Sequence, residues 1–503
     1  MRLAAAMLTP LPRGSILPSV VEERIVAFSR RSFTMRCRTL GFLWAVAAFA
    51  ALAHEPSLRA AADDEKAVQP PNILLVVADD LGWRDVGWHG ADKIRTPQMD
   101  RLAREGVDLD QHYVQPVCTP TRVALLTGRY PSRFGPHTLT PSNLRALPPG
   151  TLTLASALKS RGYATYLSGK WHLGVLPEWG PNHYGFDRSY GSLAGAADPW
   201  THQYRAGPYA KTWHRDGQLF EEEGNATELV ARQAIAWIRE AKRPWFVYVP
   251  FQAVHIPIDA PEEYKRLYDG ATFHEDAKKN DAARRFAAFV SQLDAKIGEL
   301  VRAVDETGQR ENTLIVFTSD NGGLLSGGNP YVSNVAPTPV LSSNAPLRGQ
   351  KGQLYEGGIR VPAFVNWPAR LAPRKVTAPL HAVDWMPTLA KLAGCEIEGD
   401  PKWDGRDIWP LLSTDVQPAA RTIYWAYDNA SAIRRGDWKL IERRNGKREL
   451  FDLAADASEK RDLFASEPQL ARELAALLAD ARKLDRAEIP EDAKLPQALR
   501  EGK

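Results

Sequence analysis

Short apolar segments rich in β-branched and aromatic residues alternate with helical patterns along the body of this 503-residue chain. The predicted strands are Asn72–Ala78, residues 164–168, Trp245–Pro250, residues 313–318 and residues 361–367. Helical periodicity marks residues 228–241 and 282–305. This alternation is typical of α/β proteins with a mostly parallel sheet. We therefore predict an α/β fold whose large, mixed, mostly parallel sheet is sandwiched by helices.

Polar side chains follow four of these predicted strands, at the points where the strands end. They are, in chain order, Asp79 and Asp80, then Lys170 and His172, then His255, and finally Asp320 and Asn321. Each group alone also fits an ordinary turn or a core contact. Because open parallel sheets bind ligands beyond the carboxyl ends of their strands, we expect these side chains to share one cleft.

The acidic part of this set has the composition of a metal site. Asp79, Asp80, Asp320 and Asn321 offer three carboxylates and one amide oxygen. Oxygen ligands suit a hard cation such as Ca²⁺ or Mg²⁺, and the shortage of imidazole and thiolate ligands argues against zinc. Two carboxylates 4 Å apart would otherwise repel by about 4 kcal/mol at an effective dielectric constant near 20. A divalent cation would remove that repulsion.

The cationic part of the set consists of side chains that are positively charged or can be protonated. Its members are Arg122, Lys170, His172, His255 and Lys351. A lone lysine is usually solvated, and a lone histidine after a strand is often a core residue. Five such groups beside a metal would instead surround a small tetrahedral oxyanion and stabilise the charge that develops during its transfer.

Cys118 begins the pentapeptide Cys-Thr-Pro-Thr-Arg, which ends at Arg122 and is followed by Gly128-Arg129. A cysteine that acts as a thiolate requires a nearby histidine or a cationic helix end. We expect Cys118 in a Pro-containing turn instead. The alternative is a buried cysteine in a loop.

With these residues in place, the chain resembles the type I sulfatases of the alkaline phosphatase superfamily over about residues 70–480. The matching stretches are residues 72–82, Thr96-Pro97 with Asp100, residues 118–129, 169–174 (GKWHLG), 319–323 and 356–358. Residues 113–119, 185–187 and 254–257 resemble arylsulfatase B, the N-acetylgalactosamine 4-sulfatase. Thr121 departs from the serine that many members have within C-x-P-S-R.

The resemblance implies an arylsulfatase-type sulfuric ester hydrolase with a modified cysteine and one Ca²⁺ ion. A formylglycine-generating or sulfatase-maturing enzyme would oxidise Cys118 to formylglycine. Asp79, Asp80, Asp320 and Asn321 would bind the calcium ion together with an oxygen of modified Cys118. One hydroxyl of the formylglycine hydrate would attack sulfur and form a covalent sulfate hemiester.

The resemblance also implies roles for the cationic residues. Lys170 would hold the sulfate, and Arg122 would orient the hydrate. His255 and Lys351 would protonate or stabilise the leaving oxygen. His172 would take the proton from the second hydroxyl, so that sulfate leaves and the aldehyde returns.

The substrate is expected to be a sulfated carbohydrate. Asp198, Trp200, His202, Trp213 and His214 form a polar and aromatic segment that is either a sugar platform or a set of packing residues. Galactosamine 4-sulfate in chondroitin or dermatan is the first expectation, and a sulfated algal glycan is the second. The rival hypotheses are a phosphodiesterase or phosphonate hydrolase of the same superfamily and a non-catalytic glycan-binding protein.

The ends of the chain differ from its body. Residues 1–53 hold seven arginines against Glu22 and Glu23, a net charge of +5, so about −1 of the chain's +4 remains for the rest. That balance gives no sign of a nucleic-acid partner.

We predict an export signal and disordered leader at residues 1–62. Its apolar run is too short for stable membrane insertion, so we expect a bacterial protein that is periplasmic or secreted. Arg30-Arg31 indicates twin-arginine export, whereas Met35 is an alternative start for an ordinary signal.

The predicted domains are a catalytic domain at 70–410, a C-terminal subdomain at 415–485 and a tail at 486–503. In the subdomain, residues 422–427, 432–435, 439–443 and 449–452 are predicted as short strands, and 468–484 as an amphipathic helix. The expected result is a small antiparallel sheet with a covering helix, which supports the wall of the cleft.

Overall fold

The computed structural model describes residues 70–203, 210–325, 342–416 and 418–494. The predicted export signal and leader at 1–62 lie outside the described residues. Within the described ranges, no helix is long and apolar enough to cross a membrane.

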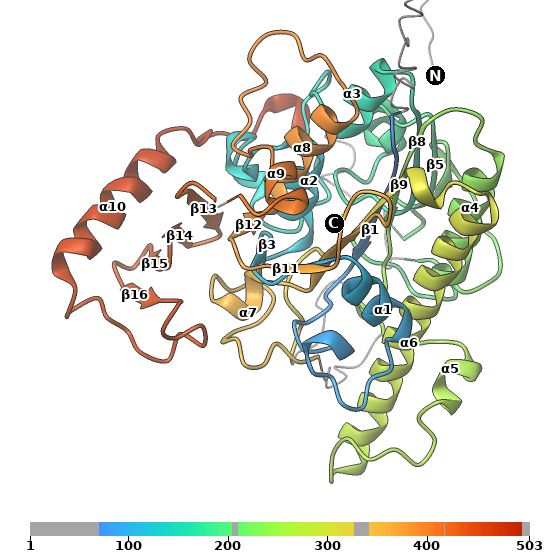
Figure 1. Ribbon diagram of the computed structural model, residues 1–503, viewed down its shortest axis with the longest axis horizontal. Helices are drawn as coiled ribbons and strands as arrows, with labels where there is room; N and C mark the ends of the chain where they lie inside the picture. Colours follow the sequence, from blue (N-terminus) through green and yellow to red (C-terminus); the bar gives the residue numbers. More distant parts are fainter. Residues whose placement is uncertain (1–69, 204–209, 326–341, 417, 495–503) are drawn as a thin grey trace, which may run out of the picture. The chain divides into compact units, whose positions relative to one another are not determined.

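The body of the protein is built on a ten-stranded sheet (Figure 1). Its strands, in spatial order, are β11 (Arg374–Val376), β2 (Val107–Leu109), β10 (Ala363–Asn366), β9 (Thr313–Ser319), β1 (Asn72–Ala78), β8 (Trp245–Pro250), β4 (Ala164–Lys170), β5 (Arg188–Ser192), β6 (Trp213–Arg215) and β7 (Gln218–Leu219). The central run from β9 to β5 is parallel, whereas β10 and β6 pair antiparallel with their neighbours. The predicted mixed, mostly parallel sheet is confirmed.

Helices cover both faces of this sheet, because the side chains of its central strands alternate between two cores. In β1, Ile73, Leu75 and Val77 belong to one core, and the residues between them belong to the other. The first core is completed by α2 (Cys118–Thr127), α3 (Leu154–Ser160) and α8 (Trp385–Leu392). The second is completed by α1 (Pro97–Glu105), α4 (Ala226–Glu240) and α6 (Ala277–Glu306).

The observed boundaries of one helix and one strand differ from the predicted ones, because capping residues and prolines are not part of the apolar pattern. Helix α6 begins at Ala277, five residues before the predicted start, because Asp276 caps it by accepting a hydrogen bond from the Lys279 N–H. Strand β10 is shorter than the predicted segment because Pro362 and Pro368 lie just outside its two ends.

A separate four-stranded antiparallel sheet follows, and it lies at the left of Figure 1 with its covering helix. It consists of β13 (Thr422–Tyr427), β14 (Ala430–Arg435), β15 (Trp438–Arg443) and β16 (Arg448–Asp452), with α10 (Pro468–Arg482). Leu474 and Leu478 of α10 share a core with Ile433 and Leu440 on one face of the sheet. The predicted C-terminal sheet and helix are thus confirmed, while the domain boundaries stay a prediction.

Of the remaining short elements, α5 (Glu262–Arg266) packs against α6. The others are α7 (Glu356–Ile359), α9 (Trp409–Ser413) and the parallel pair β3 (His112–Tyr113) and β12 (Leu380–His381). Tyr113 and Ile359 pack against Trp425 on the second face of the small sheet. The small sheet therefore has an apolar contact with the segment that carries α7.

A buried ion cluster reinforces this contact. The Lys439 Nζ lies 2.8 Å from Glu356 Oε1 and 2.7 Å from Glu459 Oε1, and all three side chains are fully buried. Tyr113 donates a 2.6 Å hydrogen bond to the other oxygen of Glu356. The lysine is thus the cation that keeps two carboxylates together in the interior.

Replacing this cation is expected to destabilise the fold. Lys439→Met removes the cation that pairs with Glu459 and leaves Glu356 with only the more distant Arg360 at 3.9 Å, so we expect the free energy of unfolding to fall by about 3–5 kcal/mol. The matched Lys447→Met, which removes an exposed lysine 3.3 Å from Glu449, should change it by less than about 1 kcal/mol. Urea unfolding followed by tryptophan fluorescence measures both variants. Equal midpoints for the two variants would contradict the role of the cluster.

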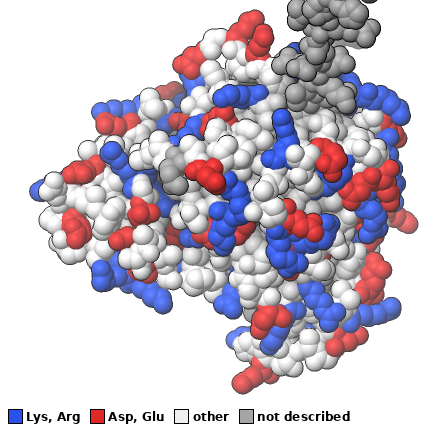
Figure 2. Space-filling model, viewed as in Figure 1, with Lys and Arg blue, Asp and Glu red and all other residues white. Residues whose placement is uncertain are grey.

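Charged side chains of both signs are interspersed over the face of the molecule in Figure 2. The whole chain has 64 Lys and Arg residues and 60 Asp and Glu residues. A site for an anionic substrate is therefore to be sought in a local cluster of residues rather than in a broad basic surface on that face.

Candidate active site

The polar residues predicted from the strand ends meet at one edge of the large sheet. Ala78, the last residue of β1, is the register partner of Ser319, the last residue of β9. The Asp320 N–H donates to the Ala78 carbonyl at 3.0 Å, and the Asp79 N–H donates to the Ala253 carbonyl at 3.0 Å. The segments after β1, β8 and β9 thus leave the sheet side by side, which brings residues 79, 255 and 320 into one region.

Asp80 lies in a turn that is fixed from several directions. Its φ angle is 65°, in the left-handed region, which is uncommon for a residue with a side chain. The Asn321 Nδ2 donates to Asp80 Oδ1 at 2.8 Å, and the Lys351 Nζ lies 2.6 Å from the same oxygen. Contacts from two distant loops therefore hold this carboxylate in place.

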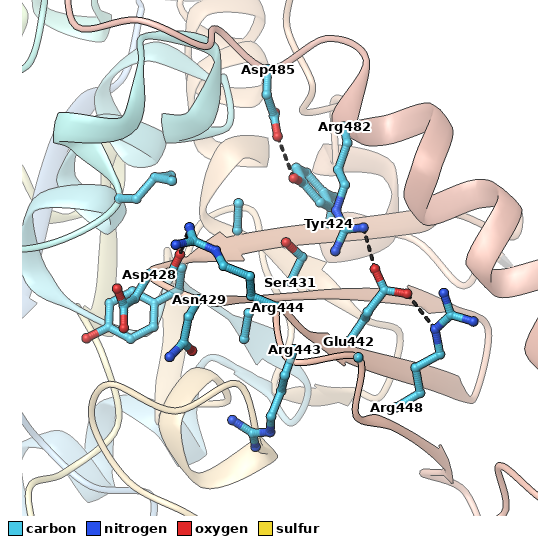
Figure 3. A pocket seen from close by; sticks show the side chains of 15 residues that line it. Tyr424, Asp428, Asn429, Ser431, Glu442, Arg443, Arg444, Arg448, Arg482 and Asp485 are labelled. Carbon is cyan, nitrogen blue, oxygen red and sulfur yellow. Dashed lines mark hydrogen bonds and ion pairs between the residues drawn. The ribbon is translucent and has the colours of Figure 1, made fainter.

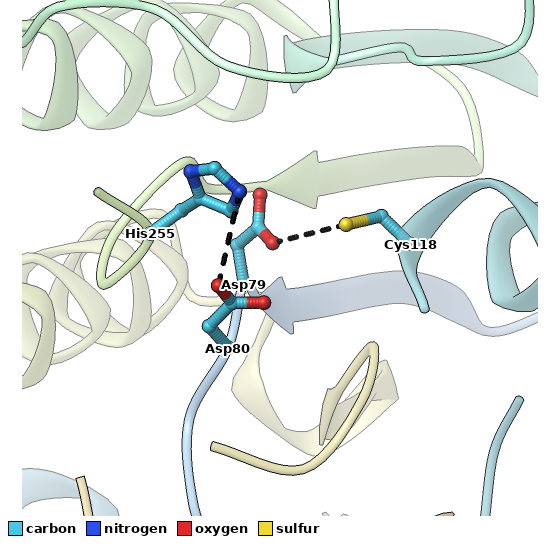
Figure 4. A group of neighbouring side chains, drawn as sticks. All are labelled: Asp79, Asp80, Cys118 and His255. Carbon is cyan, nitrogen blue, oxygen red and sulfur yellow. Dashed lines mark hydrogen bonds and ion pairs between the residues drawn. The ribbon is translucent and has the colours of Figure 1, made fainter. Parts of the chain in front are cut away.

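Cys118 is the first residue of helix α2 rather than part of a turn, so that prediction is wrong. Pro120 is compatible with the first helical turn, because the N–H groups there have no partner within the helix. The Cys118 Sγ lies 3.5 Å from Asp79 Oδ1 (Figure 4). Burial, together with the charge of Asp79, raises the pKa of the thiol to about 12. The unmodified residue is therefore a protonated thiol at neutral pH and a weak nucleophile.

Arg122 lies one helical turn after Cys118 and is fully buried. Its guanidinium donates to the Lys170 carbonyl at 2.7 Å and to Asp320 Oδ2 at 2.8 Å. The Lys170 Nζ in turn lies 2.5 Å from Asp79 Oδ2. One arginine thus connects the helix of Cys118 to the ends of β4 and β9.

The two predicted histidines are buried beside these groups. The His172 Nδ1 is buried and has no hydrogen-bond partner among the described residues, and its carbonyl accepts a hydrogen bond from Thr119 at 3.2 Å. Burial, followed by the charge of Lys170, holds the pKa of His172 well below its usual value, so the ring is neutral. The His255 Nδ1 lies 2.6 Å from the Ile256 carbonyl, and its Nε2 lies 3.8 Å from Asp80 Oδ2.

Each aspartate of the cluster contacts at least one cationic side chain. Burial raises the pKa of Asp80, but Lys351 and then His255 outweigh it, and the net effect is a pKa below the usual value. Burial and then Asp79 raise the pKa of Asp320. Three aspartates face Lys170, Lys351 and Arg122, so the site combines a carboxylate set with an equally large cationic set.

The donor atoms fit a hard cation. One ligand atom from each of Asp79, Asp80, Cys118 and His255 lies within 4.8 Å of the other three (Figure 4). The Asn321 Oδ1 is buried without a hydrogen-bond partner among the described residues, which is unfavourable unless a cation or water contacts it. The oxygens of Asp79, Asp80 and Asn321 match the ligand preference of Ca²⁺, whereas the thiol and the imidazole of this group do not. The sequence predicted His255 in the same cleft, but as a cationic residue and not as a metal ligand.

Sequence reasoning also missed residues that support the cluster. The Asn344 Oδ1 accepts hydrogen bonds from the N–H groups of Gly323 at 2.9 Å and Trp83 at 3.4 Å, so it ties the two acidic turns together. A Cβ on Gly195 would lie 2.2 Å from His172 Nε2, so the imidazole packs directly on this glycine. Neither residue belongs to a strand-end pattern, and no signal in the sequence could have found them.

The five residues of the predicted sugar platform do not share one environment. His202, Trp213 and His214 are buried, and the rings of His202 and Trp213 stack on each other. Packing is therefore the correct interpretation for these three. Asp198 accepts hydrogen bonds from the N–H groups of Trp200 and Thr201, which fixes a turn. Trp200 itself is 42% exposed.

A separate polar cavity of about 500 Å³ lies on the small sheet (Figure 3). Its Glu442 is bonded by both Arg448 and Arg482, and its Tyr424 donates to Asp485 at 2.6 Å. None of the predicted catalytic or metal-binding residues lines this cavity. The chemistry of the molecule is therefore to be sought in the cluster around Cys118.

Comparison with known families agrees with this geometry. Residues 71–395 match the family model described as Sulfatase. Residues 350–484 match a model described as the C-terminal part of N-sulphoglucosamine sulphohydrolase. The second match includes the whole of the small sheet with α10.

Individual relatives are also sulfatases. Arylsulfatase J of Mus musculus is 35% identical over 432 residues, which cover 78% of this chain and 68% of that protein. N-acetylgalactosamine-6-sulfatase of Canis lupus familiaris is 32% identical over 396 residues, which cover 74% and 72%. A crystal structure described as Ps i-CgsB in complex with k-i-k-neocarrahexaose is 31% identical and has a TM-score of 0.73, covering 84% of this chain and 94% of that one. The chain therefore belongs to the type I sulfatase family and is a sulfuric ester hydrolase.

Proposed function

We propose that this protein releases sulfate from a sulfated carbohydrate through a formylglycine made from Cys118. The single observation that carries the proposal is the buried cluster at the sheet edge, where the Cys118 Sγ lies 3.5 Å from an aspartate that is itself 2.5 Å from Lys170. A thiol with a pKa of about 12 is poorly suited to attack as it stands. A formylglycine-generating or sulfatase-maturing enzyme, which would be the partner of this chain, would oxidise the thiol to an aldehyde whose hydrate supplies the nucleophilic hydroxyl.

The hydrated aldehyde supplies two hydroxyl groups, one to displace the sugar alcohol from sulfur and one whose deprotonation expels the sulfate. Arg122 would orient the hydrate, and Lys170 would hold the sulfate oxygens. Both are fully buried, so their charges act in a medium that screens them less than water does.

His172 is the residue that we assign to proton removal. Its ring is neutral because burial and the neighbouring cations oppose protonation, and its Nδ1 has no hydrogen-bond partner within the described ranges. A neutral imidazole with an open nitrogen can accept the proton of the second hydroxyl. The contact with Gly195 limits the positions that the ring can take.

Lys351 and His255 are assigned to the leaving oxygen. The Lys351 ammonium carries three N–H donors and contacts both oxygens of Asp80, at 2.6 and 2.8 Å. The His255 Nδ1 is engaged by the Ile256 carbonyl, which leaves Nε2 toward the cluster. Either residue can stabilise or protonate the alcohol oxygen as its bond to sulfur breaks.

Asp79, Asp80, Asp320 and Asn321 would hold one Ca²⁺ ion, together with modified Cys118. When bound, the ion supplies positive charge that stabilises the sulfate oxygens during transfer. Support for this assignment comes from the buried carboxylates and from the Asn321 Oδ1 that lacks a partner among the described residues.

For the substrate we propose a sulfated sugar within a polysaccharide. The name N-acetylgalactosamine-6-sulfatase supports a sulfated galactosamine, and the neocarrahexaose in the related crystal structure supports a sulfated algal glycan. Galactosamine 4-sulfate in chondroitin or dermatan remains the first choice. We further propose that the enzyme acts in the periplasm or outside a bacterial cell.

The test compares ester classes with protein co-produced with a formylglycine-generating enzyme. We expect kcat/KM for 4-nitrophenyl sulfate to exceed that for bis(4-nitrophenyl) phosphate by at least about 100-fold, because the cationic groups of the site would contact three free oxygens in a sulfate ester and only two in a phosphodiester. Defined sulfated oligosaccharides, with ion chromatography of released sulfate, then identify the sugar. A preference for the phosphodiester would contradict the proposed function.

A further inference from the structure

An exposed aromatic side chain lies on the loop that leads away from His172. Among the exposed large hydrophobic side chains of the described residues, Trp200 is the only aromatic one. The other members exposed to this degree are aliphatic, and the neighbouring His202 and Trp213 are buried. Single exposed apolar side chains are common on protein surfaces, so any role of Trp200 depends on how its backbone and ring are held.

The backbone around Trp200 is fixed rather than loose. Asp198 Oδ1 accepts hydrogen bonds from the N–H groups of Trp200 at 2.9 Å and Thr201 at 2.8 Å. The carbonyl of Pro199 accepts a 2.7 Å hydrogen bond from the Ala226 N–H, at the first residue of α4. The turn is thereby attached to a long helix, and little conformational entropy remains to be lost when a ligand binds to it.

The ring itself is also held. Its Nε1 donates a 2.8 Å hydrogen bond to Asp259 Oδ2, and Asp259 Oδ1 lies 2.8 Å from Lys265 Nζ. The indole N–H lies in the ring plane, so this bond is made at the edge of the ring and does not use its faces. An exposed, oriented aromatic face is the surface on which the apolar face of a pyranose ring stacks.

Two chain segments lead from the catalytic cluster to Trp200 and to its partner Asp259. On one side the loop starts at Gly195, where an added Cβ would lie 2.2 Å from His172 Nε2. Trp200 is the fifth residue after Gly195, a span of at most about 18 Å. On the other side Asp259 follows His255 by four residues, at most about 14 Å. Trp200 therefore lies within about 18 Å of Gly195, and its side chain is exposed to solvent.

We propose that Trp200 is a stacking platform for a sugar ring of the glycan beyond the sulfated one, so that the enzyme acts on sulfated oligosaccharides or polysaccharides in preference to small sulfate esters. The inference rests on the proposed function and deepens it. A small aryl sulfate ends at the cluster and does not reach Trp200, whereas a chain of sugars extends past it.

The experiment compares long and short substrates in Trp200 variants. The probes are hexasaccharides of chondroitin 4-sulfate and of carrageenan, and 4-nitrophenyl sulfate is the short substrate. For the hexasaccharide from which the wild type releases sulfate, Trp200→Ala is expected to lower kcat/KM by about tenfold and Trp200→Phe by less than about threefold. Both variants should keep kcat/KM for 4-nitrophenyl sulfate within about twofold. The matched control Leu267→Ala, which truncates a side chain that is 40% exposed, should leave both substrates unchanged.

Affinity electrophoresis through gels that contain each polysaccharide gives a readout that does not need turnover. Retardation of the wild type and its loss in Trp200→Ala is the expected result. Equal losses on long and short substrates, no loss on the hexasaccharide, or no retardation of the wild type by either polysaccharide would overturn the platform. A wild type that cleaves no sulfate ester at all would instead overturn the proposed function, so the two failures are distinguishable.

Discussion

A Cys118→Ala protein is expected to release sulfate at least about 1,000-fold more slowly than the wild type, because the nucleophile is removed while the binding groups remain. Cys118→Ser, produced in a host that oxidises only cysteine, should be as inactive, because a serine hydroxyl lacks the second hydroxyl that expels sulfate. Both side chains fit the buried position at the start of α2, so the fold should persist. Sulfate release by ion chromatography and thermal unfolding by circular dichroism measure the two effects.

Cys395 provides the matched control. It is the other free cysteine of the described residues, it is partly buried, and its Sγ donates to the Ala157 carbonyl at 3.3 Å. Cys395→Ala removes the same atoms outside the cluster and should keep full activity. Turnover by Cys118→Ala that matches Cys395→Ala would show that the thiol at 118 is not the source of the nucleophile.

The second large effect concerns the metal. We expect added Ca²⁺ to raise the unfolding midpoint of the wild type, since an ion at 100 times its Kd contributes about 2.7 kcal/mol to stability. Asp80→Asn replaces one proposed ligand with a neutral group and leaves Lys351 without its carboxylate. That variant should lose the Ca²⁺ response and at least about 100-fold in kcat/KM. Differential scanning calorimetry with and without a chelator measures the response of the unfolding midpoint to Ca²⁺, and sulfate release measures the activity.

Asp108→Asn is the control for this prediction. Asp108 is a partly buried aspartate on β2 that pairs with Lys375 at 3.2 Å, outside the cluster. This variant should keep both the Ca²⁺ response and the activity. A wild type whose midpoint does not respond to Ca²⁺, or an Asp80→Asn protein that responds equally, would contradict the proposed metal site.

The sequence predicts the large sheet because buried parallel strands leave a strong local signal. Asn72–Ala78 is apolar on both faces and is found as β1 with no change of boundary. The first turns of helices are less visible, since α6 begins with a polar segment that is fixed by the Asp276 cap. Local composition therefore gives the existence of an element more reliably than its ends.

The cluster is predictable for a topological reason. Parallel neighbours place their carboxyl ends at the same edge, so Asp79 and Asp320 meet although 241 residues separate them along the chain. The helical position of Cys118 was missed because Pro120 is read as a turn signal, yet proline is tolerated in the first turn of a helix.

Contacts between loops were not predictable from the sequence. Asn344 lies 21 residues after Gly323 and 261 residues after Trp83 along the chain, and its hydrogen bonds to these two acidic turns depend on the path of the chain between them. The difference in exposure between Trp200 and Trp213 was unpredictable for the same reason. Both are tryptophans in one polar segment, and only the packing of the surrounding loops decides that one is exposed and the other buried.

The most direct test of the central claim is the mass of the Cys118 peptide, compared with specific activity across preparations with different degrees of oxidation. Conversion of the thiol to an aldehyde lowers the peptide mass by about 18 Da, and that aldehyde is the source of the nucleophile. We expect sulfate release to rise in proportion to the converted fraction and to extrapolate to zero for unconverted protein. Full activity in a preparation whose Cys118 remains a thiol would contradict this expectation.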